Sequence, residues 1–108
     1  MSEHKKLIRA KFRNDSFKRD HYTCKCCGLK GTEETLDCHH ITPREAMPAG
    51  GYIKENGITL CKIGDPSCHE KAEAYLNGEM VEGFSPEELY RKIGSSYELA
   101  VKASQRLK

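Results

Sequence analysis

Three histidines and one asparagine have types and an order that could do chemistry together: His39 and His40, then Asn56, then His69. Hydrolysis of a phosphodiester needs an activated water, a cation on the phosphate and stabilisation of the leaving oxygen. Neutral imidazoles can hold a divalent cation, and a free imidazole titrates near neutral pH, as a general base should. Two histidines on a cation and a third left free would supply that chemistry.

The adjacency of His39 and His40 raises a geometric question. Neighbouring residues of a regular strand point to opposite faces, so the two side chains reach one site only if the strand bends. Pro43 follows closely, and proline ends strands because it cannot donate to the ladder. We therefore expect a bend here, with the pair flanking a cleft. His4 and His21 are interpreted as structural or exposed.

The cysteines form a second pattern. Cys24 and Cys27 are separated by two residues, and Cys61 and Cys68 by six. Two such pairs can supply the four thiolates of a tetrahedral structural zinc site. Gly28 permits the tight backbone turn that the first pair requires. We expect zinc on these four cysteines.

Two further cysteines and the redox state leave alternatives. Cys26 could replace Cys24 or Cys27 as a ligand, although the spacing favours the outer pair, and Cys38 is interpreted as a small buried strand residue. Disulfides are the rival use of all six thiols. The N-terminal segment MSEHKKLIRAKF has no apolar run typical of a signal peptide. We therefore expect a cytoplasmic protein, in a compartment that keeps thiols reduced.

Length and charge bound the rest. The chain has 108 residues and a net charge of +2, which fits one compact domain. Residues 1–31 contain nine Lys or Arg against three acidic residues, whereas the remainder contains nine basic and thirteen acidic residues. A basic arm beside a metal site suits a polyphosphate partner; the alternative is a solvated helix face.

Periodicity and turn residues predict the elements that position these groups. We expect a basic helix over residues 5–20, with a break near Asn14-Asp15 as an alternative, and short strands at 35–41 and 57–61. A loop should connect the two strands up to Asn56. Three helices should follow: one from Cys68 to about Asn77, one from the capping box at Ser85 to Gly94, and one from about Ser95 or Ser96 to the C-terminus.

Four motifs in this order resemble the HNH endonuclease family: Arg19–Gly28, Leu36–Pro43, Glu55–Cys61 and Cys68-His69. The resemblance covers roughly residues 13–76. It implies an α+β fold, a ββα-metal (treble-clef-like) finger with a structural zinc and flanking N- and C-terminal helices. We expect a single nuclease domain over 1–108, with a core at about 13–76, a basic arm at 1–20 and C-terminal helices at about 85–107.

The resemblance also implies roles for residues. His39 would be a metal ligand and His40 the general base, Asn56 would orient the base and steady the loop, and His69 would complete the hold on the metal. Glu73 occupies a position where some members place a further histidine. It shares a helix face with His69, so it is either a third ligand, a partner behind the ligands, or an ordinary solvated carboxylate.

The expected activity is one-metal hydrolysis of DNA phosphodiester bonds, with Mg²⁺, Mn²⁺, Ni²⁺ or Zn²⁺ as the catalytic cation beside the structural Zn²⁺. The expected DNA contacts are Arg13, Lys18, Arg19 and Arg44. A bare nuclease domain with a short helical tail looks like phage or mobile-element members of the family. That likeness would place it in the host cell cytoplasm, with packaging or mobile-element proteins as partners, and predicts no membrane association.

One alternative is a non-catalytic zinc module that binds DNA or a protein partner with the same cysteines. We favour the enzyme, because a binding module has no need of adjacent histidines together with Asn56 and His69. A disulfide-linked secreted protein is a third hypothesis, and it predicts no bound zinc.

Overall fold

The computed structural model describes residues 3–107, and the side chains of 5–107; the side chain of His4 lies outside the described part. The elements follow in the order α1 (Glu3–Arg19), β1 (Leu36–His40), β2 (Gly57–Cys61), α2 (Cys68–Leu76), α3 (Pro86–Lys92) and α4 (Tyr97–Gln105). Three short 3₁₀ helices interrupt the connection between the strands, at Arg44–Ala46, Pro48–Gly51 and Lys54–Asn56. The expected loop there is therefore partly ordered.

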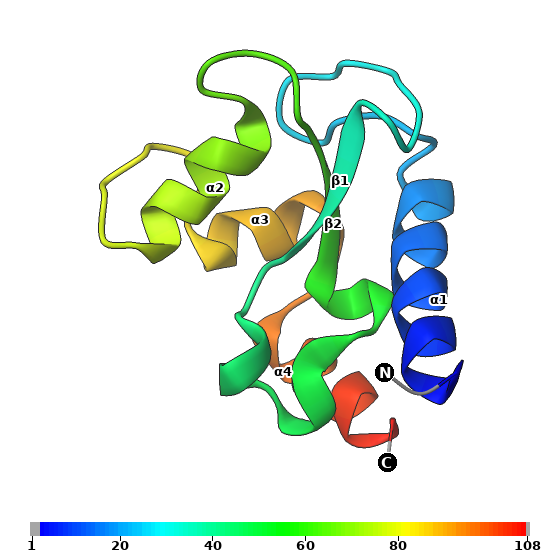
Figure 1. Ribbon diagram of the computed structural model, residues 1–108. Helices are drawn as coiled ribbons and strands as arrows, with labels where there is room; N and C mark the ends of the chain where they lie inside the picture. The colour runs from blue at the N-terminus through cyan, green and yellow to red at the C-terminus, as the bar shows by residue number, and fades with distance from the viewer. Residues whose placement is uncertain (1–2, 108) are drawn as a thin grey trace.

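The strands form a two-stranded antiparallel sheet. Leu36 pairs with Cys61, and His40 pairs with Gly57. All five residues of β2 are buried, because helices cover the hairpin on both sides: α1 lies along one side, and α2 and α3 lie on the other (Figure 1). This is an α+β fold whose two strands and following helix match the expected ββα arrangement.

Helix α1 is continuous, so the alternative of a break near Asn14-Asp15 is wrong. Asp15 instead accepts an ion pair from Lys11 at 2.6 Å, one helical turn earlier, a spacing that supports a helix. The helix approaches the hairpin closely at Gly57. A Cβ there would lie 2.6 Å from the Ser16 hydroxyl and 2.7 Å from the Phe12 ring, so only glycine fits.

The end of α1 is joined to the hairpin by Arg19. Its guanidinium donates to both carboxylate oxygens of Asp20, and to the carbonyl oxygens of Lys54 and Gly57. Asp20 is buried and accepts a further hydrogen bond from the backbone N–H of Thr59. Arg19 therefore compensates a buried carboxylate while closing the turn before β2.

The first two helices after β2 begin at capping boxes. Ser67 caps α2 with Glu70, and Ser85 caps α3 with Glu88, each pair exchanging side-chain and backbone hydrogen bonds. These caps satisfy amide groups at the helix N-termini that have no partner within the helix. The apolar core lies between these helices, α1 and the hairpin; its fully buried members include Phe17, Leu36, Ile41, Ile58, Leu60 and Leu89. No helix among residues 3–107 is long and apolar enough to cross a membrane.

We predict that Arg19→Ala lowers the free energy of unfolding by about 2–3 kcal/mol, because it leaves the buried Asp20 carboxylate without its cation. Urea denaturation measures this change. The exposed neighbour provides the control: Lys18→Ala should stay within about 0.5 kcal/mol of the parent. An unchanged urea midpoint for Arg19→Ala would contradict the structural role.

Candidate functional site

The first cysteine pair lies in a closed knuckle. The backbone N–H of Cys24 donates to the Leu29 carbonyl at 2.8 Å, and that of Gly28 donates to the Cys24 carbonyl at 2.9 Å. Gly28 has φ +82°, the left-handed conformation that glycine adopts without penalty. The N–H of Cys27 points at the Cys24 sulfur, 3.5 Å away. The knuckle thus directs both sulfurs to one side.

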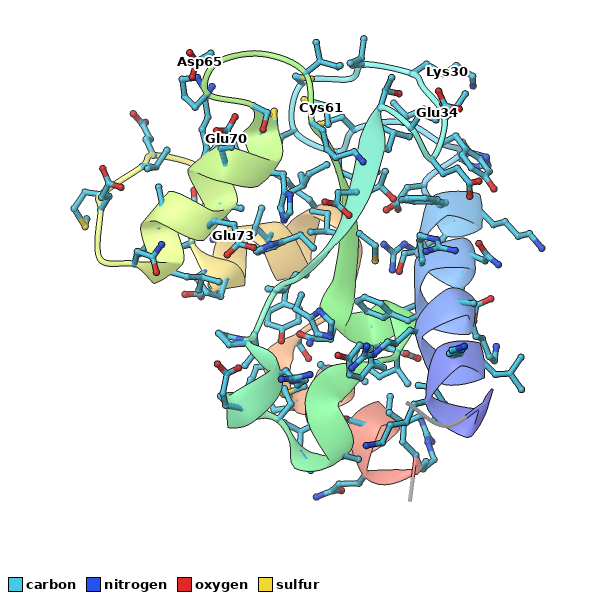
Figure 2. The ribbon with its side chains drawn as sticks, viewed as in Figure 1. Lys30, Glu34, Cys61, Asp65, Glu70 and Glu73 are labelled. Carbon is cyan, nitrogen blue, oxygen red and sulfur yellow. The ribbon has the colours of Figure 1, made fainter. Side chains whose placement is uncertain are left out.

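The second pair joins the end of β2 to the first turn of α2. Cys61 is the last residue of β2, Cys68 is the first residue of α2, and the six residues between them form the loop near the top of Figure 2, where Cys61 and Asp65 are labelled. The Cys27 and Cys61 sulfurs lie 3.7 Å apart, and all four sulfurs lie within 4.8 Å of one another. Sulfurs about 2.3 Å from a central zinc would stand roughly 3.8 Å apart. The long spacing therefore does not prevent convergence.

The thiol environments fit a cation. Burial raises the pKa of Cys24, but hydrogen bonds from the backbone of Cys27, Cys26 and Cys61 outweigh it and lower that pKa to about 7. Burial, followed by the nearby Cys24 charge, raises the pKa of Cys68. Four thiolates in one cluster, three of them buried, repel one another unless a cation offsets their charge. The cluster can hold a structural zinc ion.

The two remaining cysteines lie outside this group. Burial raises the pKa of Cys26 to about 11 and that of Cys38 to about 12. Cys26 does not join the four-sulfur group in the described chain, which favours the outer pair of the knuckle.

A second group of side chains that could hold a metal ion lies between β1 and α2. It consists of His39, His69 and Glu73, with one ligand atom from each within 4.8 Å of the others. Oε1 of Glu73 lies 3.2 Å from Nε2 of His69 and 3.6 Å from Nδ1 of His39. Glu73 lies between α2 and β1 (Figure 2). The group joins a strand residue to two residues on one face of the helix.

The burial and the unpaired ring nitrogens of His39 show whether this site suits a cation. The residue is 2% exposed, and neither ring nitrogen has a hydrogen-bond partner among residues 5–107. Burial lowers the pKa of His39 to about 3, with a smaller decrease from the charge of His69. A neutral imidazole with an unsatisfied buried lone pair is the form that binds a metal. The three side chains fit a divalent cation.

Asp37, which the sequence analysis did not single out, positions His69. Its Oδ2 lies 3.1 Å from Nδ1 of His69. This hydrogen bond raises the pKa of His69 and lowers that of Asp37. A carboxylate on Nδ1 leaves Nε2 facing Glu73 and the space where a cation could bind, and metal-binding histidines commonly have such a partner. The signal in the sequence was the two-residue spacing from His39, which places both side chains on one face of β1.

His40 lies on the opposite face of β1 from His39. Its ring centroid is 4.5 Å from that of Phe12 on α1 and 4.6 Å from that of Tyr52. The bend expected ahead of Pro43 lies at Ile41 and Thr42, directly after the pair, and β1 stays regular through His40. Because side chains alternate along β1, the two imidazoles lie on opposite faces of the strand. They can face a common ligand only at the end of β1.

The environment of His40 keeps its imidazole neutral. Burial lowers its pKa to about 4, the charge of Arg44 adds to the decrease, and a hydrogen bond with the Gly50 backbone opposes it. Nε2 is buried and has no hydrogen-bond partner in the described residues. A neutral ring with an unpaired nitrogen is the state that can accept a proton.

Asn56 is fully buried and holds the connection after β1. It accepts from the Thr42 N–H at 3.0 Å and donates to the Thr42 and Gly51 carbonyls. The Tyr90 hydroxyl donates to its Oδ1 at 2.7 Å. These bonds fix the loop that contains Gly50, the backbone partner of His40. Any effect of Asn56 on His40 therefore passes through the loop.

The four expected DNA contacts differ in their surroundings. Lys18 and Arg44 are exposed. Arg13 lines a groove of about 340 Å³ together with Lys62 and three carboxylates, those of Glu33, Glu34 and Asp37. Arg19 differs, because its donors are engaged by Asp20 and two backbone carbonyls.

Comparisons with known proteins agree with this geometry. Residues 24–74 match the family model described as HNH endonuclease. The matched segment contains all four clustered cysteines, the histidine pair, Asn56, His69 and Glu73. The chain is thus similar to an HNH endonuclease domain across the whole of the site. Neither a curated protein nor a solved structure matches it.

We predict that Asp37→Asn weakens binding of Ni²⁺ or Mn²⁺ to the zinc-loaded protein by roughly 10- to 100-fold, because His69 loses the carboxylate that orients it. Isothermal titration calorimetry measures the affinity, and metal analysis should show unchanged zinc content. Glu34→Gln, which neutralises an exposed carboxylate just before β1, is the matched control. Equal affinities for Asp37→Asn and the parent would contradict the positioning role.

Proposed function

We propose that this chain is a metal-dependent DNA endonuclease of the HNH type, which hydrolyses phosphodiester bonds. The observation that carries the proposal is the convergence of His39, His69 and Glu73 from β1 and α2, with a neutral His40 on the other face of the same strand. The family similarity over residues 24–74 supports both the reaction and DNA as the substrate.

In this proposal His39, His69 and Glu73 hold the catalytic cation. Such an ion, when bound, supplies positive charge to the scissile phosphate and to its leaving oxygen. Two imidazoles and a carboxylate suit several first-row ions, so Mn²⁺, Ni²⁺ and Zn²⁺ are candidates together with Mg²⁺. The hydrogen bond to Asp37 fixes the ring of His69, and burial restricts the ring of His39.

His40 acts as the general base, accepting a proton from the attacking water. Burial and then the charge of Arg44 lower its pKa, so the ring is in the accepting form but is a weaker base than a free imidazole. The Gly50 hydrogen bond and the rings of Phe12 and Tyr52 hold its orientation. Because His39 and His40 point to opposite faces, a phosphate that both serve must lie at the open end of β1. Asn56 stabilises the loop that follows this end.

Basic side chains around the site bind the DNA backbone. We assign this role to the exposed residues Arg13, Lys18 and Arg44. We assign Arg19 to the fold, because a guanidinium that already donates to a carboxylate and two carbonyls has little capacity left for phosphate.

We predict that His40→Ala reduces nicking of supercoiled plasmid by roughly 10²- to 10⁴-fold, the usual contribution of a general base. The zinc-loaded protein is assayed with Mg²⁺, Mn²⁺, Ni²⁺ and Zn²⁺ in turn, and nicked and linear products are quantified over time. The control is His21→Asn, since His21 is exposed, lies outside the site and has φ +56°, which asparagine tolerates.

A doubly substituted His39→Ala/His40→Ala protein, purified in parallel, sets the background from contaminating nucleases. Equal nicking by the parent and His40→Ala would remove His40 from its role. A parent that binds zinc tightly and cleaves no DNA with any of the four cations would favour the non-catalytic zinc module.

A further inference from the structure

A cavity lined by positively charged side chains lies beside His40. The first turns of α1 and the connection after β1 enclose a cavity of about 290 Å³. Three basic side chains, Lys5, Arg9 and Arg44, line it together with Tyr52 and the backbone of Gly50. No acidic side chain of the described residues is among its lining groups.

Tyr52 brings the two guanidinium groups together. Cζ of Arg9 lies over the Tyr52 ring, 5.4 Å from its centroid, a favourable cation–π arrangement. Nη1 of Arg44 lies 3.5 Å from the hydroxyl of the same tyrosine. Neither arginine forms an ion pair within the described chain, in contrast to Arg19, which pairs with Asp20. Like charges held around one cavity repel, and an anion between them would offset that repulsion.

The same tyrosine connects the cavity to the proposed base. The Tyr52 and His40 rings meet edge to face with centroids 4.6 Å apart. The positive charges of Arg44 and Arg9 both lower the pKa of His40. These contacts put the Arg9 guanidinium within about 10 Å of the imidazole. Successive phosphates of one DNA strand advance by roughly 3.4 Å along the helix axis, so a strand at His40 extends to the cavity within a few nucleotides.

We propose that this cavity binds a backbone phosphate of the DNA strand that is cleaved, a few nucleotides from the scissile one. The inference rests on the proposed function, because His40 marks where the scissile phosphate lies. Arg9 and Arg44 supply the charge, and Tyr52 holds them at a fixed separation. The site recognises phosphate in a polymer and carries no base sequence information.

The test compares DNA binding by the zinc-loaded parent, Arg9→Ala/Arg44→Ala and the charge-preserving Arg9→Lys/Arg44→Lys. A matched control, Lys30→Ala/Lys102→Ala, removes two exposed positive charges outside the cavity. The dissociation constant for a fluorescent duplex oligonucleotide is measured by anisotropy at several NaCl concentrations, with no divalent cation added, so that no cleavage is required. Circular dichroism checks that each variant is folded.

The alanine pair should bind about tenfold more weakly than the parent, a loss typical of charged hydrogen bonds. Its slope of log K against log[salt] should fall by about 1, the contribution of one phosphate contact. The lysine pair should remain within about threefold of the parent, and the control pair within about twofold. Equal losses in the alanine and control pairs, or an alanine pair as tight as the parent, would overturn the inference.

The outcomes separate this inference from the proposed function. Plasmid nicking that depends on His40, together with normal DNA binding by the alanine pair, rejects phosphate binding in the cavity and supports the proposed nuclease activity. Weak binding by the alanine pair, together with nicking that does not depend on His40, keeps a DNA phosphate site in the cavity, rejects the proposed base and overturns the placement of that site relative to the scissile phosphate.

Discussion

The convergence of four sulfurs is the constraint on which the rest of the structure depends. Cys24 and Cys27 lie in the knuckle after α1, Cys61 ends β2 and Cys68 begins α2, so a zinc ion on this cluster would join the knuckle, the hairpin and the helix. In small domains of this kind zinc binding supplies folding free energy on the order of 10 kcal/mol. Since His69 follows Cys68 directly and Glu73 lies one turn later, the ion that stabilises the fold would also set where these two side chains meet His39.

The two faces of β1 present different sets of proposed functional side chains. Alternation along β1 directs Asp37 and His39 toward α2, and directs His40 toward Phe12 and Tyr52. One face holds imidazoles and carboxylates arranged for a cation, and the other holds an uncharged imidazole beside two arginines. Burial is the main cause of the low pKa of both strand histidines. The proposed metal ligands and the proposed base are thereby separated by the thickness of one strand.

Spacing in the sequence was sufficient to predict the strands, the helix starts at Cys68 and Ser85, and the four clustered cysteines, because each depends on local periodicity, capping or a short separation. The missed features depend on contacts between distant residues. The internal role of Arg19 depends on carbonyls at Lys54 and Gly57, and the fixation of Asn56 depends on Tyr90. Asp37 was overlooked because its contact with His69 forms only in the folded chain and leaves no local pattern in the sequence. The chain bends at Ile41 and Thr42, directly after the histidine pair, as expected before Pro43, but His39 and His40 still point to opposite faces because β1 is regular through His40.

The most direct test of the central claim is a zinc titration of the reduced, metal-free protein followed by far-ultraviolet circular dichroism. If four sulfurs hold α2 against the hairpin through one ion, the helical signal should increase with added zinc and stop increasing at one equivalent per chain. A metal-free protein with the same spectrum as the zinc-loaded protein, and no change on titration, would contradict the account.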